Sequence, residues 1–461
     1  MSETTFSTVV KWATSLAWDD LPETTRMAAL HTIGNSLGLG VAGTNTETVS
    51  IILKTLETHG TFADEERTLP VLGRAARLDP VSACLVHGTA MHVEDFDDTH
   101  LSTVLHPGAP IVPVALSVAV LNGRSGRDFA TAVAAGVEIA SRVGLSLGSS
   151  HFDRGWHLTS TAGRIGGALA GGLLAGLSQD DLARVVAMAL KTLAGHTEQL
   201  GSMAKPLHPG KAAADMLRLV QMAGDGMLSD VDPRAADDGV GAEFAGTLSW
   251  ATVADGLGSG WELDANAFKP YACGIVSHPI IDVGRQLRHD GLTVDDLASV
   301  TIRVNHTVPA VMGVKEPKDG TQSKFSAYHC FAAGLLEGDG GLAEFSTELA
   351  NRPDSIAARR KVTLVVDDAM LKQSCRAAIV LSDGTEREIV IENATGSIAN
   401  PMTTADLERK FLALTRPYLA EPEAAWRRIL TLPETDGLQP VVSLVSGSHA
   451  LLSSREPAPT Y

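Results

Sequence analysis

The spacing of apolar residues changes twice along this chain of 461 residues, and no other sequence feature constrains its fold as strongly. Up to about residue 260 the spacing is helical, as in Met27–Leu37, where apolar side chains recur every three or four positions. Between residues 295 and 395 apolar and polar side chains alternate, as in Val300–Asn305, which is typical of half-buried strands. The helical spacing returns after Pro401. The sequence therefore predicts a mainly α protein with an α+β insertion.

Local signals give the expected extent of these parts. A Gly- and Ala-rich stretch at 163–176 predicts helices that approach one another closely in a central bundle, and Asp383-Gly384 predicts a hairpin turn. The apolar segment 323–336 is expected to form one helix between strands. We therefore divide the chain into a large helical domain, a smaller α+β lid domain and a helical C-terminal return that packs on the first part, with the ranges 1–264, 265–395 and 396–461.

The charge balance excludes several classes of partner. Lys and Arg total 37 against 54 Asp and Glu, which gives a formal net charge of −17. Nucleic-acid binding rests on neutralising phosphates, and docking to an anionic membrane also needs basic patches, so neither is expected. If the substrate is an anion, the protein needs local pockets of positive charge within this acidic chain.

Cysteine usage and the termini indicate the compartment. The N-terminus has an early acidic residue and lacks the basic and apolar regions of a signal peptide. The longest apolar run, Ala109–Leu121, contains prolines and is shorter than the roughly 20 residues that a membrane span requires. The cysteines form no CxxC pair and predict neither a zinc site nor a disulfide scaffold; they are Cys84, Cys273, Cys330 and Cys375. We expect a soluble, cytoplasmic protein that binds no membrane.

Carboxylates and imidazoles are concentrated in the segment His87–His106, which includes Asp95 and Thr99. Groups of these types at close spacing shift one another's pKa values and supply general acids and bases. The alternative is that the acidic residues at 97–98 only cap a helix and pair with neighbouring basic groups. The sequence alone leaves both interpretations open.

Three further segments place imidazole or ammonium groups in otherwise apolar sequence. His157 lies at the expected start of a helix, where free amide groups favour an anion. The segments 203–211 and 268–279 carry Lys205 and Lys269 and contain no acidic residue. At about 4 Å, one lysine–carboxylate contact contributes about 4 kcal/mol at an effective dielectric of about 20, before desolvation. These segments favour a polycarboxylate site; the alternatives are a core histidine and surface lysines beside proline turns.

Together these segments resemble the MmgE/PrpD family, which includes 2-methylcitrate dehydratase, cis-aconitate decarboxylase and iminodisuccinate epimerase. The resemblance covers nearly the whole chain. The motifs that carry it are DFDDT at 95–99 with His106-Pro107, GWHLTSTAG at 155–163, KPLHPGKAA at 205–213, FKPYAC at 268–273 and KFSAY at 324–328. The chain departs from the usual family pattern at His87, at Leu158 and in the spacing from Thr99 to His106, so the substrate is left open.

The resemblance implies a fold, an assembly and a set of site residues. The family fold is a large all-helical domain with a smaller α+β lid, and its members are typically homodimers that need no organic cofactor and no metal. Their active site lies in the cleft between the domains. The positions that match the family pocket are Asp95, Thr99, His106, His157, Lys205, Lys269 and Tyr328, with His208 and Tyr271 in the same motifs.

The resemblance also implies a reaction: a cofactor-independent lyase that removes water or carbon dioxide from a small di- or tricarboxylate, such as 2-methylcitrate or cis-aconitate. Cationic groups in such a site bind the carboxylates and offset the charge that develops on them. Lys205 and Lys269 are expected to bind the carboxylates of the substrate, while Thr99 and His157 orient it.

Proton transfer is assigned to His106, with Asp95 setting its tautomer and Tyr328 closing over the substrate. One alternative is an epimerase that uses His106 with Lys205 or Tyr271 on opposite faces of an α-carbon. Another is a carboxylate-binding homologue without activity. A magnesium-dependent α-helical diphosphate enzyme, suggested by the clustered aspartates, lacks the second acidic motif that it needs.

Overall fold

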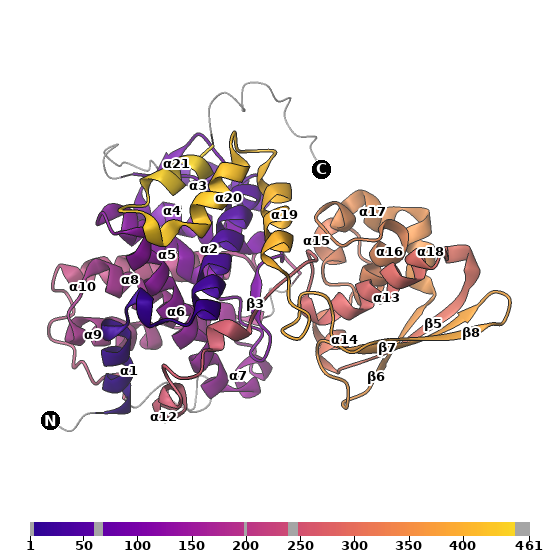
Figure 1. The fold of residues 1–461 in the computed structure, drawn as a ribbon, viewed down its shortest axis with the longest axis horizontal. Helices are drawn as coiled ribbons and strands as arrows, with labels where there is room; N and C mark the ends of the chain where they lie inside the picture. Colours follow the sequence, from indigo (N-terminus) through magenta and orange to yellow (C-terminus); the bar gives the residue numbers. More distant parts are fainter. Residues whose placement is uncertain (1–3, 60–67, 198–200, 238–247, 448–461) are drawn as a thin grey trace.

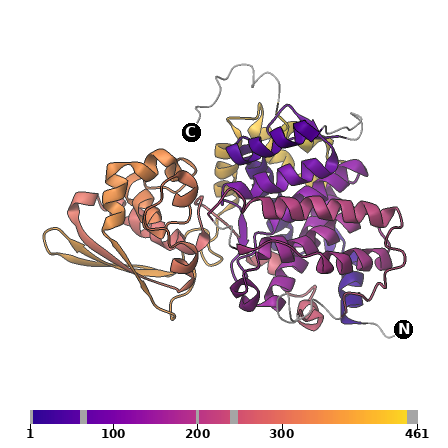
Figure 2. The ribbon, with the colours of Figure 1, turned by 180° about the vertical axis from the view of Figure 1, so that it is seen from behind.

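The computed structural model describes residues 4–59, 68–197, 201–237 and 248–447. Figure 1 shows a large helical domain beside a smaller domain in which helices cover one face of a sheet, and Figure 2 shows the same arrangement from behind. This architecture confirms the expected fold class of a mainly helical protein with a smaller α+β domain.

The large domain is built from helices contributed by both ends of the chain. Their starts carry ordinary capping signals: the side chain of Asp79 caps α4, and Ser178 caps α9 by accepting from the amide of Asp181. The C-terminal helices α19 and α20 both contact α2. The helices are α1 (Thr5–Ser15), α2 (Glu23–Gly43), α3 (Glu47–His59), α4 (Pro80–Val93), α5 (Gly108–Leu121), α6 (Gly126–Leu147), α7 (Ser149–Asp153), α8 (Leu158–Ala175), α9 (Gln179–Lys191), α10 (Leu207–Gly224), α12 (Trp250–Ala254), α19 (Thr404–Thr415), α20 (Pro422–Leu430) and α21 (Gln439–Val445), with the short strands β1 (Leu69–Pro70) and β2 (Arg77–Leu78).

The Gly-rich helix α8 lies at the centre of this domain and is buried over nearly its whole length. A Cβ atom at Gly136 of α6 would lie 2.8 Å from the carbonyl oxygen of Gly166 in α8, so the two backbones are in direct contact there. Each such glycine costs about 1 kcal/mol of helix propensity relative to alanine, and the close packing offsets that cost. The predicted close-packed bundle is therefore present.

Within the described residues, α6 is the one helix that is long and apolar enough to cross a membrane, judged by length and composition. Its apolar window is 83% buried inside the fold, as expected for a core helix.

The small domain has a four-stranded sheet in the order β6-β5-β7-β8. Strand β5 pairs with β6 in parallel, and the other pairs are antiparallel. The predicted hairpin joins β7 and β8, and Gly384 in its turn has a φ of +88°, which favours glycine. Helices α13 and α16 lie on one face of the sheet (Figure 1). The elements are β5 (Leu297–Val304), β6 (Val362–Val366), β7 (Cys375–Leu381), β8 (Glu386–Ile391), α13 (His278–His289), α14 (Thr307–Val311), α15 (Gly320–Ser323), α16 (Ala327–Glu337), α17 (Thr347–Asn351) and α18 (Pro353–Arg360).

The single helix expected at 323–336 is present as α16, but it begins four residues later than predicted. Helix α15 ends at Ser323, and α16 begins only at Ala327, capped by the side chain of Ser326. The serine accepts the amide of His329, and this local bond competes with a continuous helix. The break leaves Lys324 and its neighbours outside a helix, where they reach the large domain.

A two-stranded ladder crosses the junction between the domains. Strand β3 (Asp98–His100) pairs antiparallel with β4 (Asn266–Phe268), with Asp98 opposite Phe268. Burial raises the pKa of Asp98 to about 7, although the side chain of Asn266 and the amide of Gly108 both donate to its carboxylate. A Cβ at Gly108 would lie 2.7 Å from Asp98 Oδ1, so glycine is needed there. The ladder fixes the loop after α4 beside the loop after β4.

Acid should weaken this fold partly through His87, one of the positions where the sequence departs from the family pattern. Its Nε2 accepts the amide of Leu72 and is therefore unprotonated, and burial lowers its pKa from 6.5 to about 4. Between those values the unfolded chain holds the extra proton, so this group reduces stability as the pH falls, by about 1.4 kcal/mol per pH unit.

We predict that His87→Gln, whose amide oxygen can still accept from Leu72, reduces the slope of the unfolding free energy against pH on the acid side. The reduction should correspond to the uptake of about one proton fewer on unfolding. Urea unfolding between pH 7 and pH 4 measures this slope. His289→Gln, at an exposed site, is the matched control and should keep the original slope. Equal slopes in both variants would contradict the assignment.

Candidate active site

The acidic loop 94–97 follows α4 directly and lies in an unusual backbone conformation. Asp95 has a φ of +51°, which is rare for residues other than glycine but tolerated by aspartate and asparagine. The β3–β4 ladder places this loop against Lys269, one residue after β4. Asp95, Asp97 and Lys269 are all buried.

Asp95 is held between two lysines that come from distant parts of the chain. Lys205 Nζ binds Asp95 Oδ1, while Lys269 Nζ donates to the backbone oxygen of Asp95 at 2.9 Å and lies 3.3 Å from its Oδ2. Burial opposes ionisation of this carboxyl, but the facing ammonium groups of Lys205 and Lys269 hold its pKa well below the usual range. The two predicted cationic segments therefore converge on the predicted acidic one.

Asp97, rather than Asp95, contacts the imidazoles. Its Oδ2 lies 2.6 Å from His92 Nδ1, and its Oδ1 lies 3.3 Å from His106 Nδ1. Burial opposes ionisation of Asp97, but His106 and His92 together hold its pKa well below the usual range. Lys269 Nζ lies 3.7 Å from the same carboxylate and connects it to the Asp95 ion pairs. Asp95 was expected to set the tautomer of His106, but the carboxylate that lies beside His106 Nδ1 is that of Asp97.

The partners of His106 determine which of its nitrogens carries the proton. Nδ1 lies 3.0 Å from the backbone oxygen of Asp98, which can only accept, so Nδ1 is the protonated nitrogen. Thr99 Oγ1 lies 3.0 Å from the same Nδ1. Among the described residues no hydrogen bond involves His106 Nε2, which is left to exchange a proton with a substrate.

His157 completes a row of imidazoles next to Lys205. Its ring centroid lies 5.5 Å from that of His92 and 5.4 Å from that of His208, and its Nδ1 lies 3.2 Å from His208 Nδ1. Burial, with His92 and Lys205 next in importance, holds the pKa of His157 well below its usual range. As predicted, His157 immediately precedes a helix, because α8 begins at Leu158. A neutral His157 is suited to hydrogen bonding rather than to charge.

The small domain contacts this cluster through the break between α15 and α16. Lys324 Nζ binds the carboxylate of Glu94 and donates to its backbone oxygen at 3.0 Å. The ring of Phe325 faces Lys205 Nζ, with 5.2 Å between the ammonium and the ring centroid. Tyr328 is half-buried at the start of α16, and its ring lies 6.0 Å from Lys315 Nζ.

Tyr271 takes part in a different set of contacts. Its hydroxyl donates to Asp282 Oδ1 at 2.5 Å and also contacts Arg285. Burial and the neighbouring carboxylate raise the pKa of this hydroxyl above its usual value. The structure thus brings together Asp95, Thr99, His106, His157, His208, Lys205 and Lys269, places Tyr328 at the adjoining lid segment, and directs the hydroxyl of Tyr271 toward helix α13.

The chain matches two family models that are consecutive along the sequence. The MmgE/PrpD N-terminal domain matches residues 7–252, and the MmgE/PrpD C-terminal domain matches residues 271–432. The chain belongs to the MmgE/PrpD family. The resemblance stated from the sequence motifs is therefore confirmed.

Three proteins that are similar to this chain are each named cis-aconitate decarboxylase. Cis-aconitate decarboxylase of Mus musculus is 28% identical over 403 residues, which cover 82% of this chain and 80% of that protein. Cis-aconitate decarboxylase of Homo sapiens is 26% identical over 450 residues, with 92% and 91% covered. Cis-aconitate decarboxylase of Aspergillus terreus is 23% identical over 476 residues, with 95% of each chain covered.

Three residues of the charged cluster were not predicted from the sequence. Asp97 stands inside the quoted DFDDT motif and His92 inside the polar segment, so a signal was present but did not say which aspartate meets His106. Lys410 of α19 is also buried against the cluster, and nothing in the spacing of its neighbours indicated this.

Within the described residues, one group of side chains lies close enough together to bind a metal ion, and it consists of two imidazoles of the cluster and Asp97. One ligand atom each from His92, Asp97 and His106 lies within 4.8 Å of the other two. The Nδ1 proton of His92 already points at Asp97 Oδ2, and the Nδ1 proton of His106 points at the backbone oxygen of Asp98. A cation at that point would have to displace two protons, so the donor set fits a hydrogen-bond network better than a resident metal.

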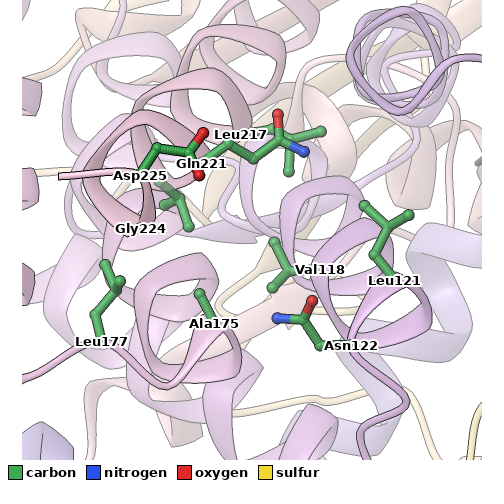
Figure 3. Close-up of a pocket in the computed structure, with 10 residues that line it drawn as sticks. Val118, Leu121, Asn122, Ala175, Leu177, Leu217, Gln221, Gly224 and Asp225 are labelled. Carbon is green, nitrogen blue, oxygen red and sulfur yellow. The ribbon is translucent and has the colours of Figure 1, made fainter. Parts of the chain in front are cut away.

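A pocket lies elsewhere, in the large domain. It has a volume of about 480 Å³ and is formed where the C-terminal ends of α5, α8 and α10 meet, beside Asn122, Gln221 and Asp225 (Figure 3). The charged cluster is instead packed at the domain junction, where its side chains bind one another.

Removing the Asp95 carboxylate should be costly because it leaves two buried ammonium groups without their counter-charge. We predict that Asp95→Asn, which tolerates the positive φ, lowers the free energy of unfolding by about 3–5 kcal/mol at pH 7. Adding Lys205→Met to this variant should recover part of the loss. Urea unfolding measures both effects, and the exposed variant Asp232→Asn should be unchanged.

Proposed function

We propose that this chain is a cofactor-independent lyase, and that it decarboxylates a small unsaturated tricarboxylate of the cis-aconitate class. The observation that carries the proposal is the buried arrangement in which the carboxylate of Asp97 lies 3.3 Å from Nδ1 of His106, close to Lys269, while Lys205 and Lys269 bind Asp95. The cis-aconitate decarboxylase relatives support the same reaction class.

Substrate binding is assigned to the lysines and their polar neighbours. Each ammonium already bonds Asp95, so a substrate carboxylate shares Lys205 and Lys269 rather than meeting unpaired cations. A contact at about 4 Å contributes about 4 kcal/mol at an effective dielectric of about 20, before desolvation. Thr99 and neutral His157 orient the bound carboxylates by hydrogen bonding.

The proton comes from Nε2 of His106. When the bond between the leaving carboxylate and the carbon chain breaks, carbon dioxide departs and its electron pair passes into the chain beside the remaining carboxylates. Nε2 of His106, unprotonated in the free protein, takes up a proton from water before each turnover. The imidazolium then delivers that proton to the carbon and returns to the neutral form. Asp97 stabilises the imidazolium by its charge, as a carboxylate does beside a catalytic imidazole, and the backbone oxygen of Asp98 keeps Nδ1 as a donor. The lid residue Tyr328 closes over the substrate and excludes water.

The test is proton NMR of the purified protein in heavy water with cis-aconitate, citrate, 2-methylcitrate and iminodisuccinate in separate samples. Decarboxylation of cis-aconitate with one deuteron in the product supports the proposal. Loss of water from citrate or 2-methylcitrate would contradict the proposal and identify the protein as a dehydratase. Exchange at an α-carbon of iminodisuccinate without net loss of a group would replace it with an epimerase, and no reaction in any sample would favour a binding protein.

We predict that His106→Gln lowers kcat by about 100-fold or more, because it removes the group that delivers the proton. Asp97→Asn should also lower kcat, because the imidazolium of His106 loses its counter-charge. The matched control is His306→Gln, a surface histidine whose partner is the exposed Asp368. Steady-state kinetics check the result, and near-normal turnover of His106→Gln would remove this residue from the mechanism.

A further inference from the structure

A lysine from the C-terminal return of the chain is buried directly behind the site. Lys410 Nζ donates to the backbone oxygen of Phe96 at 2.6 Å and to that of Lys269 at 2.9 Å. The same Nζ lies 3.9 Å from the centroid of the Phe96 ring. Its helix, α19, lies on the side of the large domain that faces the small domain (Figures 1 and 2). One amine therefore joins the two loops that carry the charged cluster.

The positions of these two carbonyl groups explain why an amine is needed there. In the β3–β4 register Asp98 is opposite Phe268, so continuing the ladder by two residues would place Phe96 opposite Pro270. Proline has no amide hydrogen and cannot donate to the facing strand. Lys410 supplies the missing donor and holds the two loops together beyond the point where the ladder ends. Phe96 itself separates Asp95 from Asp97 in the sequence.

The surroundings of the amine are unusual for a lysine. Burial lowers the pKa of Lys410 well below its usual range, with Asp97 and Asp98 opposing this shift and Lys269 adding to it. A buried amine with two carbonyl acceptors is satisfied by its hydrogen bonds, so its charge is not required for the contact. A change to an apolar side chain instead leaves two buried carbonyl oxygens without that donor.

We propose that Lys410 is a positioning residue for the active site: by binding the carbonyl groups of Phe96 and Lys269 it sets Asp97 against His106 and Lys269 against Asp95. The proposal rests on the proposed function for its kinetic consequence, but its structural consequence does not. Without the amine, loop 94–97 and the following Asp98 shift relative to Lys269, so that the carboxylate of Asp97 and the backbone oxygen of Asp98 both lose their positions beside Nδ1 of His106.

The experiment compares Lys410→Met with Leu407→Ala, which weakens the packing of the same helix at a buried apolar position. The first measurement is nitrogen-15 NMR of the imidazoles, with the His106 signals identified by their loss in His106→Gln. The native protein and Leu407→Ala should both show protonated Nδ1 and unprotonated Nε2. Lys410→Met should show His106 in both tautomers. This measurement needs no substrate, so it stands even if the proposed reaction is wrong.

The second measurement is steady-state kinetics on the substrate that the heavy-water experiment identifies. Lys410→Met should lower kcat at least tenfold with a smaller change in KM, while Leu407→Ala keeps native values below its unfolding temperature. Lys410→Gln retains an amide donor and should recover part of the loss, and it serves if Lys410→Met does not fold. Native His106 signals and native kcat in both Lys410 variants would overturn the proposal and leave Lys410 as a packing residue.

Discussion

The ion pairs around Asp95 are the interaction on which the rest of this molecule depends. Charges are expensive to bury, and they persist in an interior only when each finds a partner with good geometry. Here the partners are Lys205, which precedes α10, and Lys269, which follows β4. Since these segments are far apart in the sequence, the large domain has to close correctly before any of the charges is satisfied. The same closure brings the imidazoles together.

Backbone strain is concentrated around the same cluster. Among the described residues, Asp95 and Val104 are the non-glycine positions with positive φ, at 51° and 60°, and they lie on either side of β3. Such conformations cost of order 1–3 kcal/mol each and persist only where the surroundings determine them. The lysine contacts fix one side of this segment, and the amide of His106, which donates to Thr159 of α8, fixes the other. The strained segment is therefore held at both ends by the fold.

The sequence predicted the large-scale architecture because apolar periodicity reports which face of an element is buried. Helices and strands followed from it, whereas the β7–β8 hairpin followed from the Asp383-Gly384 turn signal and the cationic segments from lysines in stretches without acidic residues. It could not predict the break at Lys324, which depends on the side chain of Ser326 outcompeting a helical turn and on contacts with Glu94. Nor could it choose between Asp95 and Asp97, two residues apart, since an irregular loop has no period. Lys410 gave no signal because its role comes from a proline on another element.

The dependence of the site on α19 has a consequence for the order in which the protein matures. The ribosome releases the charged loop and both lysine segments long before residue 410, and during that interval Phe96 and Lys269 have no amine to bind their carbonyl groups. Domains fold as their residues emerge, and incompletely paired segments are then exposed to misassociation. A nascent chain of this protein can build most of its core cotranslationally, yet the contacts of the charged cluster are complete only after residue 410 has been synthesised. Premature termination before residue 410 would therefore yield a polypeptide in which the carbonyl groups of Phe96 and Lys269 lack this donor.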